Sequence, residues 1–206
     1  MLKTIRAKPC YLVLYLILFV LTGCGVTSPP SHFYVLSPMA EMATEQKKIT
    51  DSDSISISIG PISLPKYLKK QQIVTRSGSN ELQLAEFDRW AGKIEEDIGR
   101  VIAENLAYLL STDRVLSYPA IEAVEADYTI AMDISRFDGN LEGNVELIAR
   151  WAIFDVEGKV AKGLTATRII EPLQGNTYAD MVAAQSRALG ALSRELGDAF
   201  KHLMAR

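Results

Sequence analysis

From residue 33 onward, hydrophobic and polar positions follow the spacing of strands in some stretches and of helices in others. In residues 54–59 isoleucine alternates with serine, which predicts a half-buried strand, and we expect Gly60-Pro61 to end it. Short apolar runs on both sides of Ser77-Gly78-Ser79-Asn80 predict a β-hairpin. Strands are predicted at residues 33–36, 54–59, 73–76, 81–84, 127–137, 144–155 and 160–171.

Two stretches place apolar residues three and four positions apart, as in a helix that buries one face. The first runs from about Ala91 to Ser111. The second begins after Thr177, whose hydroxyl we expect to cap the helix, with Asp180 placed as in a capping box. Because its apolar residues recur nearly every 3.5 positions, a coiled-coil seam is an alternative to a helix packed on a sheet.

The order of these elements predicts an α/β (α+β) two-layer sandwich. The last three strands have short connections and predict an antiparallel meander. We therefore expect a mixed, largely antiparallel sheet with two main helices packed on one face. Two helices cannot cover both faces of so large a sheet, so the other face is expected to be exposed or covered by a partner. Residues 39–53 are polar and predict a loop, and residues 33–206 predict a single domain.

The N-terminus has the pattern of a secretory leader. Lys3, Arg6 and Lys8 precede an apolar run at residues 11–21, about half the length that spans a bilayer. The alternative is an N-terminal membrane anchor that is never cut. Leu21-Thr22-Gly23-Cys24 resembles the lipobox of bacterial lipoproteins. The resemblance implies a signal peptide over residues 1–23, cleavage before Cys24, and acyl chains on that cysteine.

The residues after the cysteine predict a tether. Residues 24–32 begin with the lipidated cysteine and are rich in serine and proline, and the seven residues 25–31 span roughly 20 Å when extended. Resemblance to sorted lipoproteins implies that Gly25, in place of aspartate, favours the periplasmic face of the cell outer membrane. The attachment would rest on acyl chains in the inner leaflet of that membrane, because two or three chains hold firmly where one is marginal.

Composition argues against several other classes of protein. Hydrophobic residues make up 48% and charged residues 23% of the 206 positions, as in a folded domain. The formal net charge of -3 falls to -6 without the leader, which removes three cations and no acid, so we expect no nucleic-acid partner. Two distant histidines and the absence of phosphate-loop, nucleophile-elbow and zinc motifs predict no cofactor, no metal and no enzyme activity. Glu95-Glu96-Asp97 is attributed to the helix dipole rather than to a catalytic pair.

Two segments are candidates for contact with a partner. Arg89 and Trp90 precede the first helix, and arginine and tryptophan are enriched at interface hot spots. The alternative is a core tryptophan beside a surface cation, which we favour for Trp151. Pro61, Leu64 and Tyr67 belong to an apolar loop that is either tucked under the domain or presented to a partner.

An ordered set of short segments resembles one family. From about Phe33 to the C-terminus, the chain is similar to the PqiC (YmbA) lipoproteins, also called ABC-type transport auxiliary lipoproteins. Gly92-Lys93 departs from the family pattern. The segments that carry the resemblance are Ile59 to Leu68, Gln72 to Arg76, Arg89-Trp90-Ala91, Asn105-Leu106, Asp127-Tyr128, Arg136 to Gly139, Val145-Glu146-Leu147, Trp151 and Asp155.

The resemblance implies a function that the residues alone do not. It implies a non-enzymatic outer-membrane subunit of an MCE-type intermembrane lipid transport system that supports envelope integrity. Its partners would be the MCE-domain protein that bridges the periplasm and further copies of itself in a homo-oligomeric ring. The alternative is a periplasm-facing carrier that holds lipid between sheet and helices. A hydrolase is a third class, for which the sequence offers no nucleophile–base pair.

Overall fold

The computed structural model describes residues 29–39, 55–117 and 126–205. The chain divides into two compact units, residues 1–30 and 31–206, and the fold below is that of the second. The predicted leader, Cys24 and the predicted loop at 39–53 lie outside the described residues, apart from Met39.

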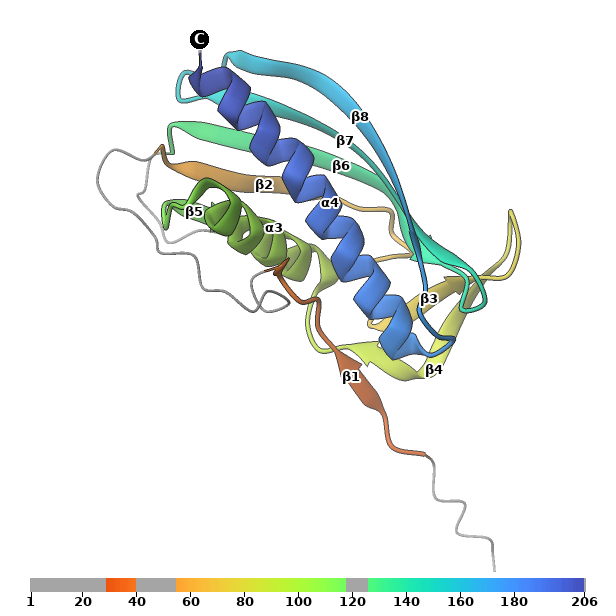
Figure 1. Ribbon diagram of the computed structural model, residues 1–206. Helices are drawn as coiled ribbons and strands as arrows, with labels where there is room; N and C mark the ends of the chain where they lie inside the picture. The colour runs from red at the N-terminus through yellow and green to blue at the C-terminus, as the bar shows by residue number, and fades with distance from the viewer. Residues whose placement is uncertain (1–28, 40–54, 118–125, 206) are drawn as a thin grey trace, which may run out of the picture. The chain divides into compact units, whose positions relative to one another are not determined.

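Within the described residues, eight strands form one sheet (Figure 1). The strands lie in the order β1-β4-β3-β6-β2-β5, and β7 pairs with the other side of β6 and carries β8 at its far edge. Their bounds are β1 (His32–Tyr34), β2 (Ile57–Ser63), β3 (Gln72–Arg76), β4 (Leu82–Trp90), β5 (Val115–Ser117), β6 (Tyr128–Gly139), β7 (Asn144–Asp155) and β8 (Val160–Pro172).

The prediction of a mixed sheet is confirmed, but its largely antiparallel character is wrong. The pairs β1–β4, β2–β5, β2–β6 and β3–β6 are parallel. The predicted hairpin β3–β4 and the meander β6–β7–β8 are antiparallel, as expected from their short turns. Sequence patterns detect pairs joined by tight turns, whereas parallel neighbours are joined by long crossovers that leave no local signal.

Both helices of the described part, α3 (Ile94–Leu110) and α4 (Tyr178–Met204), lie on the same face of the sheet (Figure 1). The two-layer arrangement is therefore confirmed. Thr177 caps α4 through a capping box with Asp180, as predicted. The near-3.5 spacing of α4 reflects packing on β7, β8 and α3, and not a coiled-coil seam.

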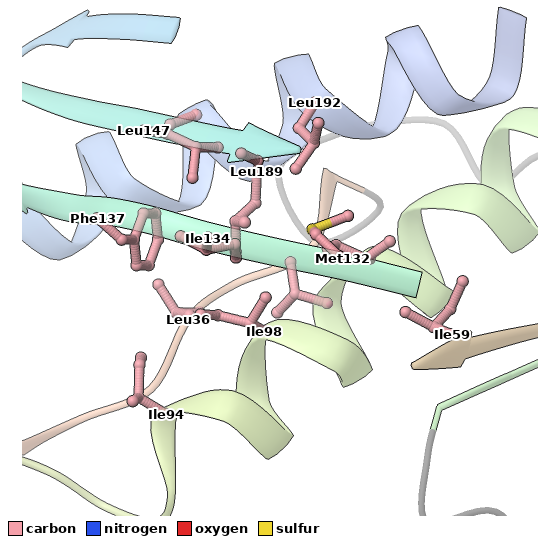
Figure 2. Packing of buried hydrophobic residues seen from close by; sticks show 14 of the residues in the cluster. Leu36, Ile59, Ile94, Ile98, Met132, Ile134, Phe137, Leu147, Leu189 and Leu192 are labelled. Atoms are coloured by element: carbon pink, nitrogen blue, oxygen red, sulfur yellow. The ribbon is translucent and has the colours of Figure 1, made fainter. Parts of the chain in front are cut away.

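Large apolar side chains fill the layer between helices and sheet. Figure 2 shows Ile98 of α3 and Leu189 and Leu192 of α4 beside Ile134 and Phe137 of β6. Trp151 is also buried, and its Nε1 donates to Thr167 Oγ1 at 3.0 Å, so its assignment to the core is confirmed.

Two details of the strands differ from prediction. β2 continues through Gly60-Pro61, which is a cis peptide, and a register shift between Ile59 and Ile62 accommodates it. β5, a strand of three residues, is absent from the predicted strands.

A buried amide joins three segments of the helical layer. Asn105 of α3 is fully buried, and its Nδ2 donates to Ser193 Oγ of α4 at 3.1 Å. Its Oδ1 accepts from the backbone N of Met39 at 2.6 Å. The segment that follows β1 is thus held against both helices by one side chain.

We predict that Asn105→Leu lowers the free energy of unfolding by about 1–3 kcal/mol, because buried partners of the amide lose their hydrogen bonds. Urea unfolding followed by circular dichroism measures the change. Asn176→Leu, at an exposed site before α4, is the control and should change stability by less than about 0.5 kcal/mol. Equal effects of the two substitutions would contradict the structural role of Asn105.

Candidate functional site

The two predicted contact segments meet beside the N-terminal end of α3. Pro61 lies in β2, whereas Leu64 and Tyr67 lie in the connection from β2 to β3. Arg89 and Trp90 end β4, and the backbone N of Trp90 donates to the carbonyl O of Gln71, in the same connection, at 2.7 Å. Segments 28 residues apart in sequence, such as those of Pro61 and Arg89, therefore border one region.

The structure shows how far Arg89 and Trp90 are buried. Trp90 is only 5% exposed and belongs to the hydrophobic core, as in the alternative of a core tryptophan. As the last residue of β4, it is paired with Tyr34 of β1 and covered from that side. Arg89 is half-buried, and its Nε is buried without a hydrogen-bond partner among the described residues.

The apolar loop is partly buried in the domain and partly exposed to solvent. Leu64 is buried in the core cluster, whereas Pro61 is exposed and Tyr67 is half-buried. The two alternatives that the sequence left open are thus both present in one segment. Its buried leucine fixes the loop, and Pro61 remains accessible from solvent.

Two hollows flank the start of α3. One, of about 330 Å³, is lined by apolar groups of Tyr34, Val35 and Trp90 and by charged side chains of α3. The other, of about 190 Å³, is lined by residues that include Pro61 and Ile62 of β2. Glu96 borders both hollows, and Val35 is 57% exposed. We call the surface around the two hollows the α3 entry surface.

The acidic triplet at the start of α3 has a structural role, as predicted. Asp97 Oδ2 accepts from the backbone N of Leu36 at 2.7 Å, and its Oδ1 accepts from Arg100 Nη2 at 2.6 Å. Glu95 lies 3.8 Å from Lys69 Nζ. These contacts complement the helix dipole and hold the segment after β1 and the β2–β3 connection against α3.

Tyr67, in the connection from β2 to β3, contacts a second feature, a buried pair of carboxylates. Its hydroxyl donates to Asp138 Oδ2 at 2.7 Å. Asp138 of β6 is fully buried and lies directly opposite Glu146 of β7, which is also buried. Like charges in directly opposed positions destabilise a sheet unless cations compensate them.

Three arginines supply that compensation. Arg76 of β3 donates to Asp138 through Nε at 2.9 Å and Nη2 at 3.1 Å. Arg136 bridges the two acids, with Nε 3.1 Å from Asp138 Oδ1 and Nη1 paired with Glu146 Oε2. Arg168 of β8 pairs with Glu146 from the other side. We call Tyr67, Arg76, Arg136, Asp138, Glu146 and Arg168 the arginine–carboxylate network.

The network lies on the sheet face opposite the helices. Phe137 is in the core, and its carbonyl O accepts from Gln185 Nε2 of α4 at 3.0 Å. Successive side chains of a strand point to opposite faces, so Asp138 points away from the helices. The face that was predicted to be exposed or covered by a partner thus carries fixed charges where it joins β3.

Electrostatics within the network favour the charged form of Asp138. Burial raises the pKa of this carboxyl, but hydrogen bonds from Arg76 and Tyr67 and the charges of Arg76 and Arg136 outweigh burial and hold its pKa below the usual value. The phenol responds in the opposite direction, because burial and the hydrogen bond to Asp138 raise the pKa of Tyr67 to about 12. Tyr67 therefore remains a hydrogen-bond donor at all physiological pH values.

Sequence reasoning did not identify this network as a site. Arg76, Arg136, Asp138 and Glu146 were noted only as parts of short similar segments. The sequence did contain a signal, because Asp138 and Glu146 are acidic residues in or directly after predicted strands and stand next to core residues. Which arginines would reach them depends on the parallel neighbour β3, which the pattern did not reveal.

Comparisons with known proteins agree with this fold. Residues 34–197 match the model of the family described as ABC-type transport auxiliary lipoprotein component, and the chain belongs to that family. A crystal structure of an uncharacterised protein matches with a TM-score of 0.65 at 15% identity, covering 82% of this chain and 98% of its own. Protein XCC0632 from Xanthomonas campestris matches with a TM-score of 0.64 at 15% identity, covering 81% and 93%. No curated protein matches the sequence.

The described residues contain neither a metal-binding cluster nor a membrane-spanning helix. No group of three or more histidine, cysteine, aspartate or glutamate side chains there is arranged to hold a metal ion. No helix in that part of the chain is long and apolar enough to cross a membrane.

We predict that Asp138→Ala lowers the free energy of unfolding at pH 7 by about 3–5 kcal/mol, because it leaves arginines without their buried partner. Since the folded-state pKa of Asp138 is depressed, its contribution is present above the unfolded-state value of about 3.9 and is lost as pH falls through the folded-state pKa. The difference between variant and wild type should therefore shrink on acidification, as measured by urea unfolding across pH.

Asp133→Ala is the matched control on the same strand. Asp133 pairs with Arg150 at 2.9 Å in an exposed position, so its loss should cost less than about 1 kcal/mol. Comparable losses for the two variants, or a loss for Asp138→Ala that does not depend on pH, would contradict the argument.

Proposed function

We propose that this protein is a non-enzymatic outer-membrane lipoprotein of an MCE-type intermembrane lipid transport system. It docks the periplasm-spanning component at the outer membrane and supports envelope integrity. The observation that carries the proposal is membership of the ABC-type transport auxiliary lipoprotein family over residues 34–197. The lipobox-like Leu21-Thr22-Gly23-Cys24 behind an apolar leader supports it independently.

In this proposal the membrane attachment is covalent. Cleavage before Cys24 and acylation of that cysteine place two or three chains in the inner leaflet of the outer membrane, and each buried methylene contributes about 0.8 kcal/mol. Gly25 supports outer-membrane sorting. The tether at residues 24–32 keeps the domain of residues 33–206 close to the bilayer.

The α3 entry surface is the docking site in this proposal. Exposed Pro61 and Val35 contact the partner, Tyr67 and Arg89 contribute from half-buried positions, and the buried Leu64 and Trp90 hold the surface in shape. Acyl anchoring raises the effective concentration of this surface near the bridge, so moderate contacts suffice for stable capture. Further copies in a homo-oligomeric ring would multiply the contacts.

The packing of the interior favours docking over the alternative of a lipid carrier. A carrier needs a large apolar cavity between sheet and helices. That layer instead contains the largest fully buried side chains, Phe137 and Phe200, together with leucines and isoleucines of both helices. Figure 2 shows Phe137 beside Ile98, Leu189 and Leu192. Lipid that co-purifies with the delipidated-anchor protein in native mass spectrometry would support the carrier instead.

We predict that Cys24→Ser abolishes acylation and releases the protein from the outer membrane. Mass spectrometry of the N-terminal peptide and membrane fractionation measure the two effects. Cys10→Ser is the matched control, because the leader containing Cys10 is removed before acylation is complete. Retention of unmodified Cys24 joined to the leader in the wild type would overturn the anchoring proposal.

We predict that Val35→Glu and Pro61→Glu together reduce capture of the MCE-domain bridge by about tenfold or more, because they replace the exposed apolar residues of the docking site by charged ones. The measurement is co-purification of the bridge with full-length lipoprotein from solubilised envelopes. The control is Leu164→Glu on β8, which is 72% exposed and outside the α3 entry surface. Unchanged capture by the double variant would exclude this surface as the docking site.

A further inference from the structure

A polar hollow lies next to the arginine–carboxylate network, between the β3–β4 and β6–β7 turns. Its volume is about 380 Å³. It is lined by Arg76, Ser77, Ser79, Arg136, Asn140 and Asn144, with two glycines between them. Two arginines, two serines and two asparagines thus border one space, and none of the lining residues is acidic.

The two guanidinium groups are held in fixed positions. Arg76 uses Nε and Nη2 for Asp138, and its Nη1 donates to the carbonyl O of Ser79 at 3.1 Å. Arg136 uses Nε for Asp138 and Nη1 for Glu146. Among the described residues this leaves Arg136 Nη2 and part of the Arg76 fork for another acceptor. An anion would meet donors that are already ordered, which reduces the entropic cost of binding.

The side chains that line the hollow include two cations and no anion. The buried carboxylates that pair with these arginines, Asp138 and Glu146, are not among the lining residues. The hollows at the α3 entry surface differ, since Lys93 and Arg100 are accompanied there by Glu96 and Asp97. A cationic hollow on a domain with net negative charge selects an anionic ligand.

We propose that this hollow binds a phosphate group, either of a phospholipid headgroup or of a small phosphate ester. A phosphate presents several oxygens in different directions, which suits donors arriving from β3, β6 and two turns, whereas a carboxylate presents two oxygens in one plane. The volume suits a phosphate with a small substituent, so acyl chains would remain outside. The site extends the docking role by giving the protein a ligand of its own.

The experiment measures phosphate binding by the full-length lipoprotein in a nonionic detergent. Isothermal titration calorimetry and ³¹P NMR are run with three probes, which are inorganic phosphate, glycerol 3-phosphate and dihexanoyl phosphatidylglycerol. Ser79→Asp adds a carboxylate at a residue that lines the hollow and replaces neither arginine, and Ser79→Asn is the matched neutral control. Thermal unfolding confirms that both variants are folded.

We expect Ser79→Asp to weaken binding of phosphate by about tenfold or more through charge repulsion, and Ser79→Asn to change it by less than about threefold. Similar affinities for all three probes identify a small phosphate as the source, whereas a clear preference for the phosphatidylglycerol identifies a headgroup. Absence of binding of any probe at millimolar concentration overturns the proposal. Equal affinities of wild type and Ser79→Asp, or equal weakening in both variants, also overturn it.

Discussion

The pairing of two buried carboxylates on neighbouring strands constrains much of this structure. Asp138 of β6 and Glu146 of β7 lie directly opposite each other. Both are buried, so water does little to compensate their charges. Each needs a cation that comes from within the protein, because an unpaired buried charge costs several kcal/mol. Arg136 bridges them, but one guanidinium cannot neutralise two acids. Arg76 from β3 and Arg168 from β8 complete the set and so tie together four strands.

This requirement also explains how β2, β3 and the connection between them lie along one edge of β6. β2 pairs with β6 as far as Asp133, and β3 pairs with it at Gly139. The β2–β3 connection spans the part of the edge between these positions, and Tyr67 donates to Asp138 from it. The same connection also accepts a hydrogen bond from the backbone N of Trp90, so it contacts both the network and the α3 entry surface. A partner bound at one of them would therefore contact residues whose positions the other helps to fix.

Local sequence patterns predicted those elements whose signals are local. The meander β6–β7–β8 and the hairpin β3–β4 have short turns, and both helices have a clear apolar stripe and, for α4, a capping box. The parallel pairs were not predicted, because β3, β4, α3 and β5 separate β2 from β6 along the chain. The same limit explains Trp90. Its position before a helix left its burial open, and the strand that pairs with it, β1, lies nearly 60 residues earlier in the chain. Burial that comes from a distant strand leaves no periodic trace at the residue itself.

The two faces of the sheet therefore contribute to the structure in different ways. The helical face is packed with aliphatic and aromatic side chains, which provide stability through burial. The opposite face, where it meets β3, carries an ionic network, and networks of this kind are often no more stabilising than apolar side chains of similar size. What the network does supply is a fixed geometry, because bidentate arginine contacts restrict both partners in orientation. A protein that acts by position rather than by chemistry depends on such fixed surface geometry, since each degree of freedom lost on binding lowers affinity. The ionic face and the α3 entry surface fit the docking role proposed above, in which the fold would present ordered groups and a membrane attachment would supply their concentration.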